Sequence, residues 1–282
     1  MILVFGASGK TGSATVDALQ ARGVAFRAAY RDPAKLAAAR RRGVDGVAAD
    51  YGDAASLDAA LAGIERVFLV APPVPDLLEL ERAAVAAAGR AGVRHVVKLS
   101  AWDVPRGRYL FTLPHQAVEA LLVGSGMEWT FLRPNGFMQQ LLASAPMIRD
   151  TGTWVFPFGG ASAVIDTRDV GRVAAECLAG SGHQGQAYEL SGPEPLTQEQ
   201  QMATLSQVLG REIRYVAPPD EEWRAGALAA GLPEWLVDRL IDLQRYFRGG
   251  EGARVTPEVE RLTGSPPTSF RRFAQDYASA FG

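Results

Sequence analysis

Residues 2–12 of the chain read ILVFGASGKTG, and this stretch decides the fold. An apolar run of four residues is followed by three glycines spaced three residues apart, and then by a segment that favours a helix from about Thr11 to Arg22. The run is too short for a helix and too continuous for a strand with one wet face, which is typical of a parallel strand covered on both sides. The stretch therefore predicts a buried strand, a glycine turn and a helix.

The alternation of short apolar runs and longer helical segments continues to about residue 190. Strands are predicted at 24–30, 46–49, 67–70, 93–99, 129–132 and 187–190, and helices between them at 33–42, 54–62, 76–91, 114–124 and 169–179. Repeated βα units form parallel sheets that helices cover on both faces. The sequence therefore predicts an α/β fold with a doubly wound parallel sheet, the Rossmann arrangement.

The alternation weakens after Pro134. Residues 146–160 are rich in glycine, proline and aromatic side chains, and one more strand is predicted at 212–217 among several helices. We therefore expect two domains, with the sheet in residues 1–190 and a smaller α+β cap in residues 191–282. The cap is expected to cover the carboxyl edge of the sheet.

The composition excludes several classes of protein. With 29 Lys and Arg against 31 Asp and Glu in 282 residues, the net charge is −2, which lacks the basic excess of proteins that bind nucleic acid or anionic membranes. The single cysteine, Cys177, excludes intrachain disulfides, and three scattered histidines give no metal-binding pattern. No apolar run reaches the roughly 18 residues of a membrane span. We expect a cytoplasmic protein without a bound metal, and both a monomer and a homodimer stay open.

The glycine turn carries the first candidate site. Gly6, Gly9 and Gly12 fall where a parallel sheet presents a helix N-terminus, whose N–H groups and dipole favour a pyrophosphate. Gly6 would permit the tight turn, Gly9 the close approach of phosphates, and Gly12 the packing of helix on strand. The alternative is a plain strand-to-helix turn. The pattern favours dinucleotide binding by the residues of this loop: Gly6, Ser8, Gly9, Lys10, Thr11 and Gly12.

The end of the second strand indicates which dinucleotide is bound. Arg31 lies nineteen residues after Gly12, where an NAD-specific site would carry a carboxylate for the ribose 2′-hydroxyl, and Lys35 follows one helical turn later. A carboxylate would repel a 2′-phosphate, whereas a guanidinium binds it through two hydrogen bonds. The sequence therefore predicts NADP(H) as the cofactor. The alternative is that Arg31 is only a solvated arginine at a helix start.

Further candidates follow the ends of the later strands, because ligands of a doubly wound sheet bind at its carboxyl edge. Asp50 and Tyr51 are placed to flank the adenine, although Asp50 is equally suited to be a helix N-cap. The other candidates are expected beside the middle of the cofactor or beside its nicotinamide: Ala71, Pro72, Pro73, Ser100, Pro134, Asn135 and Phe137.

These motifs together resemble the NmrA-like branch of the short-chain dehydrogenase/reductase superfamily. The resemblance rests on the glycine turn and on residues 31–33 (RDP), 98–100 (KLS), 126–134 (GMEWTFLRP), 137–138 (FM) and 166–170 (DTRDV). Within that branch, residues 9–13 (GKTGS), 70–73 (VAPP), 196–197 (LT), 209–211 (LGR) and 263–267 (TGSPP) are similar to the ergot-alkaloid dehydrogenases of the festuclavine synthase and agroclavine dehydrogenase types. The resemblance implies an NADPH-dependent reductase of quinones, cationic dyes or iminium compounds, or a nucleotide-sensing regulator without turnover.

One departure from that superfamily concerns the proton donor. Short-chain dehydrogenases carry Tyr-x-x-x-Lys on the helix after the fifth strand, and the matching positions here are Phe111 and His115. Phenylalanine donates no proton, so Tyr109 and His115 are the candidate catalytic residues. An alternative role for His115 is to orient the ribose or the nicotinamide. Lys98, at the end of a strand, is a candidate for either task, or it faces solvent.

The sequence thus predicts an NADPH-dependent reductase that transfers hydride to a small electrophilic acceptor, an iminium or quinone type, without the usual Tyr-Lys pair. The alternative is a non-catalytic NADP(H) sensor that acts through a protein partner. Arg133 and Asp169 are expected to form an ion pair. Several aromatic residues either line a pocket for an apolar or aromatic substrate, with 146–160 as a substrate-side loop, or form core: Trp154, Phe156, Phe158, Trp223, Trp235, Tyr246 and Phe247.

Overall fold

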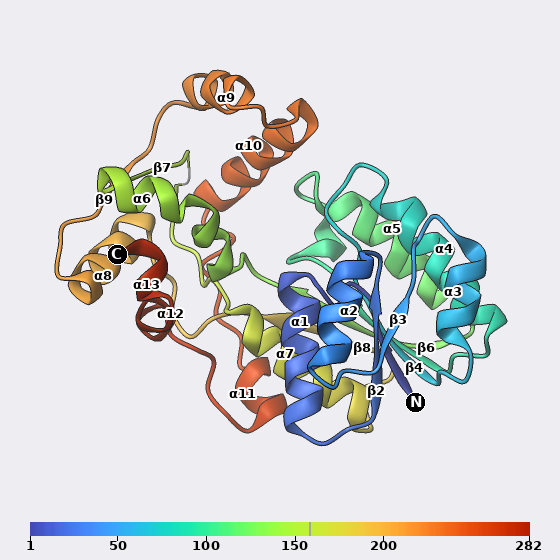
Figure 1. The fold of residues 1–282 in the computed structure, drawn as a ribbon. Coiled ribbons are helices and arrows are strands. Elements are labelled where there is room, and N and C mark those ends of the chain that lie inside the picture. The colour runs from blue at the N-terminus through green and yellow to red at the C-terminus, as the bar shows by residue number, and fades with distance from the viewer. Residues whose placement is uncertain (158) are drawn as a thin grey trace. The chain divides into compact units, whose positions relative to one another are not determined.

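A computed structural model gives the fold of residues 1–157 and 159–282 (Figure 1). The chain divides into two compact units: unit 1 is residues 1–105, 113–134 and 167–189, and unit 2 is residues 106–112, 135–166 and 190–282. These units differ from the expected domains because 135–166 packs with the C-terminal part, where buried side chains of 138–154, 202–213 and 270–281 share one core. The division of labour between a cofactor domain and a cap stays a prediction.

Unit 1 is built on a seven-stranded sheet. Its strands lie in the order β3-β2-β1-β4-β5-β6-β8, and the pairs from β3 through to β6 are parallel. The strands span Ile2–Val4 (β1), Phe26–Tyr30 (β2), Gly46–Ala48 (β3), Arg66–Leu69 (β4), His95–Leu99 (β5), Glu128–Pro134 (β6) and Gln186–Leu190 (β8). The strand order reverses between β1 and β4, which is where a doubly wound sheet binds its ligand. The predicted α/β fold with a doubly wound sheet is confirmed.

Helices cover both faces of this sheet (Figure 1). On one face lie α1 (Lys10–Ala21), α2 (Pro33–Arg41) and α7 (Thr167–Ala179); on the other lie α3 (Ala54–Leu61), α4 (Leu77–Arg90) and α5 (Thr112–Val123), which the short η1 (Val104–Arg106) precedes. The backbones of α1 and α7 touch, because a Cβ placed on Gly171 would lie 2.5 Å from the carbonyl carbon of Ala14. A hydrophobic core joins β1, β4 and β5 to α3, α4 and α5.

Two of the strand-to-helix turns supply an aspartate that caps the next helix. Asp32 caps α2 and Asp53 caps α3, each accepting N–H groups of the first helical turn. Asp50 is therefore not the helix N-cap that the sequence allowed. Its Oδ1 instead accepts from the N–H of Gly52 at 2.9 Å, which shapes the turn before the cap.

Unit 2 is mostly helical. Its elements are η2 (Met138–Ser144), α6 (Ala145–Thr151), β7 (Thr153–Val155), α8 (Gln198–Leu209), β9 (Arg214–Val216), α9 (Asp220–Ala229), α10 (Glu234–Arg248), α11 (Glu258–Thr263), α12 (Phe270–Asp276) and α13 (Ala278–Phe281). Residues 146–160 are not simply a loop, because they contain most of α6 and all of β7. The reason is a distant partner: β7 pairs in parallel with β9, which follows it only after α7, β8 and α8.

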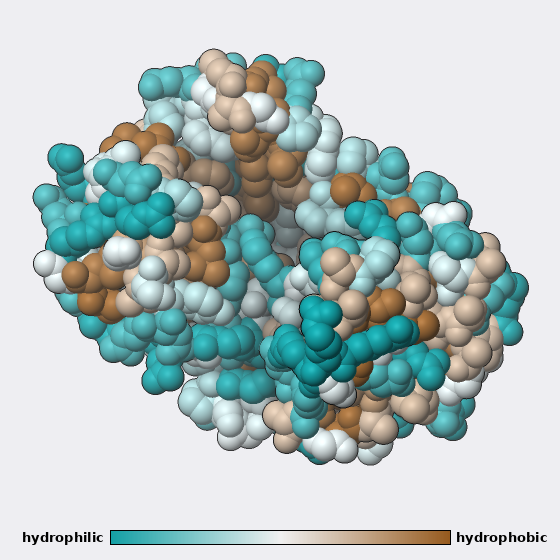
Figure 2. All heavy atoms as spheres, viewed as in Figure 1, coloured by the Kyte–Doolittle hydropathy of each residue, from teal (hydrophilic) through white to brown (hydrophobic). Residues whose placement is uncertain are grey.

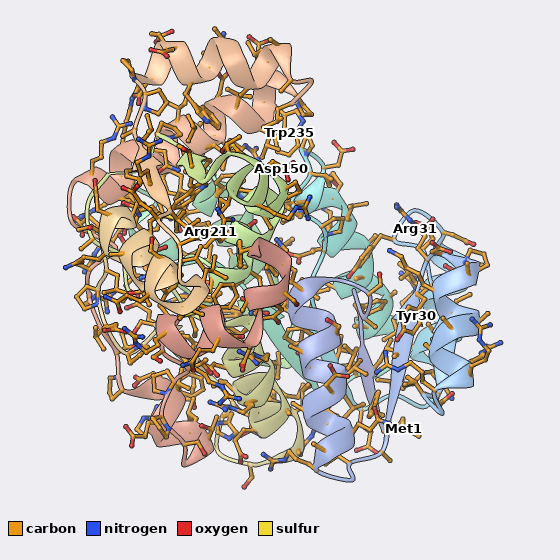
Figure 3. The ribbon with its side chains drawn as sticks, turned by 60° about the vertical axis from the view of Figure 1, so that its left-hand side comes forward. Met1, Tyr30, Arg31, Asp150, Arg211 and Trp235 are labelled. Atoms are coloured by element: carbon orange, nitrogen blue, oxygen red, sulfur yellow. The ribbon has the colours of Figure 1, made fainter. Side chains whose placement is uncertain are left out.

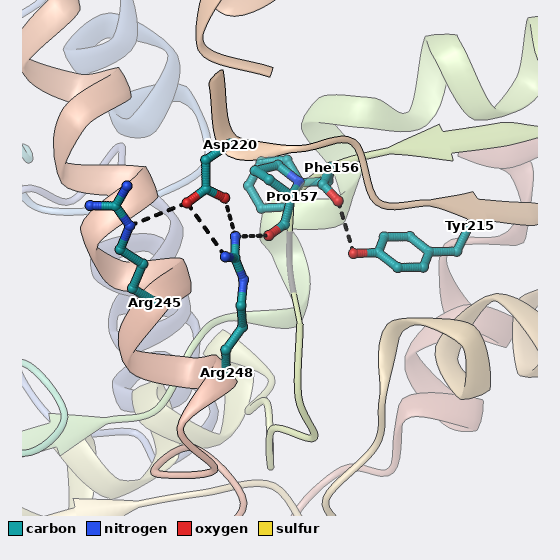
Figure 4. A network of polar contacts seen from close by, with 6 residues as sticks. All are labelled: Phe156, Pro157, Tyr215, Asp220, Arg245 and Arg248. Atoms are coloured by element: carbon teal, nitrogen blue, oxygen red, sulfur yellow. Dashed lines mark hydrogen bonds and ion pairs between the residues drawn. The ribbon is translucent and has the colours of Figure 1, made fainter. Parts of the chain in front are cut away.

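Aromatic side chains fill part of unit 2. Trp154 stacks on Phe156 with ring centroids 5.7 Å apart, and Tyr215 lies 5.6 Å from Trp154. The hydroxyl of Tyr215 donates to the carbonyl oxygen of Phe156 at 2.8 Å (Figure 4). Trp154 is thus a core residue, 7% exposed, whereas Phe158 lies outside the described residues. A substrate pocket lined by the other aromatic residues stays a prediction.

An acidic residue anchors the segment that follows β7. The carboxylate of Asp220 pairs with Arg245 at 3.2 Å and with Arg248, and Arg248 also donates to the carbonyl oxygen of Pro157 at 3.0 Å (Figure 4). The hydrogen bond from Arg248 is the main cause that lowers the pKa of Asp220. The start of α9 is therefore tied to the end of α10 by charge.

Candidate active site

The glycine turn between β1 and α1 has the geometry that its spacing predicts. Gly6 adopts a φ of +59°, and a Cβ there would lie 2.9 Å from the carbonyl oxygen of Val70. A Cβ on Gly12 would lie 2.1 Å from the carbonyl oxygen of Gly6, so glycine alone lets α1 begin this close to the turn. Gly9 closes the turn by donating its N–H to the same oxygen at 2.8 Å.

The N-terminus of α1 has no side-chain cap. Its N-cap residue is Gly9, no cap hydrogen bond is made, and the first turn contains no acidic residue. Ser8 and Gly9 are exposed, and partial burial lowers the pKa of Lys10, the first residue of the helix. A helix start of this kind attracts anions through its N–H groups and its dipole, and it suits the phosphates of a dinucleotide.

Arg31 and Lys35 stand beside the end of β2, the neighbouring strand. Both side chains are exposed, and neither makes a hydrogen bond or an ion pair within the part of the chain that the structure describes. The carboxylate of Asp32 is occupied as the cap of α2. Figure 3 shows Arg31 next to Tyr30 at the edge of unit 1. Both cations are thus available to a ligand phosphate.

The loop after β4 is fixed from two sides. Tyr51 donates its hydroxyl to the carbonyl oxygen of Val70 at 2.8 Å, and burial, followed by the nearby Glu81 carboxylate, raises the pKa of this hydroxyl. The N–H of Ala71 donates to Oε1 of Glu81 at 3.1 Å. Pro72 and Pro73 are exposed directly after it. Tyr51 therefore supports the loop at the point where the strand order reverses.

A buried ion pair lies behind this loop. The Nζ atom of Lys98 is 2.7 Å from Oε2 of Glu81, and the two side chains are 0% and 1% exposed. Lys98 also donates to the carbonyl oxygen of Leu99 at 2.6 Å and lies 3.1 Å from Nδ1 of His115. The alternative of a solvent-facing Lys98 is wrong, because both faces of β5 are covered and the side chain is 0% exposed, with its ammonium group beside Glu81, Leu99 and His115. Burial raises the pKa of Glu81, and Lys98 opposes that shift.

This arrangement selects one tautomer of His115. An ammonium group has donors and no acceptor, so Nδ1 of His115 has to accept and the ring proton stays on Nε2. His115 is half-buried on α5. Its Nε2 therefore carries the ring proton beside the carboxyl end of β5.

Glu81 belongs to no motif, but its position in the sequence carries a signal. Leu77, Ala84, Val85 and Ala88 form the buried stripe of α4, and Glu81 falls within that stripe. A carboxylate on a buried helical face is costly unless it is paired. Its place on the apolar face thus indicates a buried cationic partner, although the sequence does not say which.

Ser100 belongs to a second polar cluster. Its hydroxyl donates to Oε1 of Glu119 at 2.6 Å, and Arg133 binds the same carboxylate through two hydrogen bonds, of 3.0 and 2.5 Å. The expected pair of Arg133 with Asp169 is therefore wrong. The paired strands β5 and β6 bring Ser100 and Arg133 together under α5, while Asp169 pairs with Arg172 at 2.9 Å on its own helix.

Of the remaining candidates, Asn135 and Phe137 lie in unit 2 and Pro134 lies in unit 1. Both ends of the Asn135 amide are engaged, because Nδ2 donates to the carbonyl oxygen of Gly252 at 2.9 Å and Oδ1 accepts from the N–H of Gly136 at 2.7 Å. Phe137 is half-buried at the start of η2. Pro134, which ends β6, is buried in unit 1.

The two candidate catalytic residues belong to different units. Tyr109, in unit 2, is 6% exposed, and its ring lies 4.6 Å from that of Tyr246. Phe111 follows it and is half-buried. His115 lies one turn into α5, in unit 1.

Two further properties concern residues 1–157 and 159–282. No group of three or more His, Cys, Asp or Glu side chains is placed there to hold a metal ion. Among the same residues, no helix has both the length and the apolar character that crossing a bilayer requires. Cys177 is buried in α7.

Residues 6–180 match a protein family described as NAD(P)H-binding. The chain belongs to this family. The match begins at the first glycine of the turn and extends through α7, so it includes the open start of α1, the cations beside β2 and the Glu81–Lys98–His115 cluster.

This NAD(P)H-binding protein is similar over its whole length to several reductases. It is 39% identical to an NAD(P)H azoreductase from Xenophilus azovorans and 40% identical to a (4-alkanoyl-5-oxo-2,5-dihydrofuran-3-yl)methyl phosphate reductase from Streptomyces griseus, in each case over 100% of this chain and 99% of the relative. The NADPH complex of a quinone oxidoreductase from Escherichia coli has a TM-score of 0.90 and 28% identity, and covers 99% of this chain and 100% of that one. The resemblance to ergot-alkaloid enzymes is confirmed, since an agroclavine dehydrogenase from Claviceps fusiformis is 28% identical over 98% of this chain and 96% of its own length.

Proposed function

We propose that this protein is an NADPH-dependent reductase that transfers hydride to a small electrophilic organic acceptor, such as an iminium ion or a quinone. The observation that carries the proposal is the uncapped N-terminus of α1 behind the glycine turn, together with Arg31, directly after β2, and Lys35, on α2, two cations that pair with no described residue. An azoreductase and a quinone oxidoreductase among the relatives support a small-molecule acceptor.

The residues of unit 1 fit the parts of NADPH in turn. The N–H groups at the start of α1 would hold the pyrophosphate, and Gly9 leaves room for it. Arg31 and Lys35 would hold the 2′-phosphate, for which NADH has only a hydroxyl. Because neither cation has an acidic partner among the residues that the structure describes, binding NADPH would break no ion pair there. The cofactor would therefore be NADPH rather than NADH.

The class of acceptor follows from the absence of a proton donor at Phe111. Bound NADPH supplies a hydride, and a neutral ketone that takes it up also needs a proton for the new alkoxide. A positioned acid typically accelerates such a step by about 100-fold to 10,000-fold. Phe111 stands at the tyrosine position of the superfamily and donates no proton. An iminium ion instead loses its positive charge on reduction, and the product anion of a quinone is delocalised, so these acceptors need little help from an acid.

His115 would supply a hydrogen bond in place of that acid. Its Nε2–H is a neutral donor, and Lys98 holds the ring from the opposite nitrogen at 3.1 Å. Lys98 is itself held by Glu81 and by the carbonyl oxygen of Leu99, and because its side chain is 0% exposed it would act on the substrate only through His115. His115 would thus orient the nicotinamide or the acceptor. The buried Tyr109 is the alternative donor.

The test is a panel of acceptors assayed with NADPH. Quinones, iminium ions, enones and simple ketones are each mixed with enzyme, and NADPH oxidation is followed by absorbance, while a separate fluorescence titration measures NADPH binding. We expect turnover with quinone or iminium acceptors. Tight NADPH binding without turnover of any acceptor would favour the non-catalytic sensor instead, and a failure to bind NADPH would contradict both functions.

A further inference from the structure

One carboxylate of unit 1 holds two parts of the candidate site. Oε1 of Glu81, on α4, accepts the N–H of Ala71 at 3.1 Å, and Oε2 lies 2.7 Å from Nζ of Lys98. Ala71 belongs to the loop after β4, whereas Lys98 lies on β5 with its ammonium group 3.1 Å from Nδ1 of His115. All four residues belong to unit 1. Glu81 therefore connects the loop after β4 to His115 through a single side chain.

Stability alone does not explain a charged pair at this place. Charged side chains normally stay at the surface, as those over α2 do in Figure 2, whereas Glu81 and Lys98 are 1% and 0% exposed. Replacing a buried ion pair by apolar residues of similar volume is often neutral or stabilising, because taking two charges out of water is costly. The pair is better explained by the positions that it fixes.

The place of His115 in unit 1 suits the nicotinamide end of the cofactor. Arg31 and Lys35 follow β2, on one side of the glycine turn, so the rest of a bound NADPH would extend to the other side, across β4 and β5. Neighbouring strands are about 4.8 Å apart, and β5 is the second strand from β1, so β5 lies about 10 Å from the strand that ends in the turn. The ribose and the nicotinamide together span a comparable distance from the pyrophosphate. His115, beside the carboxyl end of β5, would therefore lie near the nicotinamide.

The two oxygens of the Glu81 carboxylate serve different parts of that cofactor. The contact with Ala71 fixes the backbone of the loop that would lie beside the middle of NADPH. The contact with Lys98 supplies the counter-charge of an ammonium group that is buried next to His115. An ammonium group donates a charge-assisted hydrogen bond, which is stronger than the bond from a neutral amine. Glu81 would thus act on His115 through Lys98.

We propose that Glu81 is a positioning residue of the reductase, which holds the loop after β4 for the cofactor and, through Lys98, holds the ring of His115 for the nicotinamide. This proposal rests on the reductase function proposed above. Glu81 itself touches neither the hydride nor the acceptor, so its effect on the rate of hydride transfer passes through His115.

A double-variant cycle tests whether the effect of Glu81 on the rate passes through His115. Glu81→Gln keeps an amide oxygen for the N–H of Ala71 but removes the counter-charge of Lys98. In enzyme loaded with NADPH we expect it to lower the single-turnover rate with a cyclic iminium ion by about two-fold to ten-fold, and by no more than His115→Ala does. In the His115→Ala background the same change should have no further effect. A fall of equal size in both backgrounds, or no fall in Glu81→Gln, would overturn the proposal.

A pair of double variants tests the contact with the loop. Glu81→Gln with Lys98→Met and Glu81→Leu with Lys98→Met both lack the buried charges, and they differ in the acceptor for the N–H of Ala71. We expect the dissociation constant of NADPH, measured by fluorescence titration, to be at least about five-fold higher in the variant with leucine. Equal dissociation constants would refute the role at the loop. The variant with glutamine also replaces Glu81→Gln in the cycle if the lone charge of Lys98 prevents folding.

A spectroscopic signal separates this proposal from the reductase function. The chain has three histidines, so the ring ¹⁵N resonances of His115 can be assigned by comparison with His115→Ala. In the protein loaded with NADP⁺, Glu81→Gln should move the Nδ1 resonance, because Lys98 without a counter-charge donates a weaker hydrogen bond.

Glu119→Gln is the matched control for this signal. It removes the charge of another buried carboxylate of unit 1, which contacts Ser100 and Arg133, and it should leave the Nδ1 resonance of His115 in place. Both results would stand even if no acceptor were reduced, in which case the reductase function alone fails. An Nδ1 resonance that stays in place in Glu81→Gln would refute the contact through Lys98.

Discussion

One ion pair of each unit shows two opposite uses of charge. In unit 1, Lys98 and Glu81 pair with side chains that are 0% and 1% exposed, whereas in unit 2 the side chains of Arg245 and Asp220 are 63% and 16% exposed. Removing one member of a buried pair leaves an unpaired charge in a dry environment, while an exposed pair exchanges protein contacts for water at little cost. The difference indicates that the buried Glu81–Lys98 pair fixes positions, at His115 and at the loop after β4.

The largest effect should come from breaking that buried pair. Lys98→Ala should destabilise unit 1 by about 3–5 kcal/mol, and Arg245→Ala should cost unit 2 less than about 1 kcal/mol. Hydrogen exchange read by mass spectrometry assigns each loss to its unit. The double variant Lys98→Met with Glu81→Gln removes both charges but keeps an acceptor for the N–H of Ala71, and it should recover most of the loss. If Lys98→Ala and Arg245→Ala lowered the free energy of unfolding by the same amount, the contrast between the buried and the exposed pair would be wrong.

Acid should also affect the two units at different pH values. Burial, then Arg66 and His183, lower the pKa of His95 to about 4, and its Nε2 lies 2.8 Å from Oγ1 of Thr130. Because the folded pKa is below the unfolded value of about 6.5, stability is complete above pH 6.5 and falls by about 3 kcal/mol as the pH drops to 4.

The corresponding group of unit 2 is Asp220, whose pKa is lowered by the hydrogen bond from Arg248. Its contribution to the stability of unit 2 is therefore lost only as the pH falls below the ordinary aspartate pKa of about 3.9. Urea unfolding at pH 7.5 and 5.0, with hydrogen exchange in each unit, checks both windows. His95→Gln should flatten the dependence of unit 1 between these values. If unit 2 lost stability at pH 5.0 while unit 1 kept its stability, the result would contradict this account.

The glycine turn should separate cofactor binding from folding. A Cβ at Gly9 would meet only the carbonyl oxygen of Gly6, at 3.2 Å, so Gly9→Val should fold, yet its side chain would occupy the place of the pyrophosphate. We expect NADPH affinity to fall by at least about 100-fold, which is about 2.7 kcal/mol. Gly89→Val, where a Cβ meets nothing within 4 Å, is the control and should bind normally. Tight NADPH binding by Gly9→Val would place the phosphates elsewhere.

Arg31 should decide between the two nicotinamide cofactors. Arg31→Ala should weaken NADPH binding at least about ten-fold, because a charge-assisted contact is lost, and should leave NADH binding within about two-fold. Lys35→Ala should also weaken NADPH binding, but by less than Arg31→Ala does. Titration of each variant with both cofactors measures the difference. Equal affinities of the unaltered protein for NADPH and NADH would exclude the assignment.

The smallest effect is expected at His115. Because an iminium ion needs no proton, His115→Ala should lower its reduction by no more than about ten-fold, through lost orientation. Steady-state kinetics with saturating NADPH measures this. A loss of several hundred-fold for an iminium acceptor would make His115 an acid or an essential part of the reaction, and Tyr109→Phe is the parallel variant.

The sequence predicts the structure of unit 1 better than that of unit 2, and the reason is physical. In unit 1 each strand, helix and glycine turn is encoded locally, so the sheet and the turn from Gly6 to Gly12 could be predicted. In unit 2, β7 depends on β9, a distant segment, and residues 146–160 look like a loop without it. The cluster of Glu81, Lys98 and His115 escapes prediction for the same reason, since its members come from α4, β5 and α5 and meet only after folding.

The central claim is that this site delivers hydride without delivering a proton, and a single-turnover experiment tests it most directly. Enzyme loaded with NADPH is mixed in a stopped-flow instrument with a cyclic iminium ion, or with the ketone of matched size, and the loss of NADPH absorbance gives the rate of hydride transfer. We predict that the iminium ion reacts at least about 100-fold faster than the ketone, the factor that a missing acid costs. Reduction of the unactivated ketone at a comparable rate would contradict the account, because a proton donor would then have to act in place of Phe111.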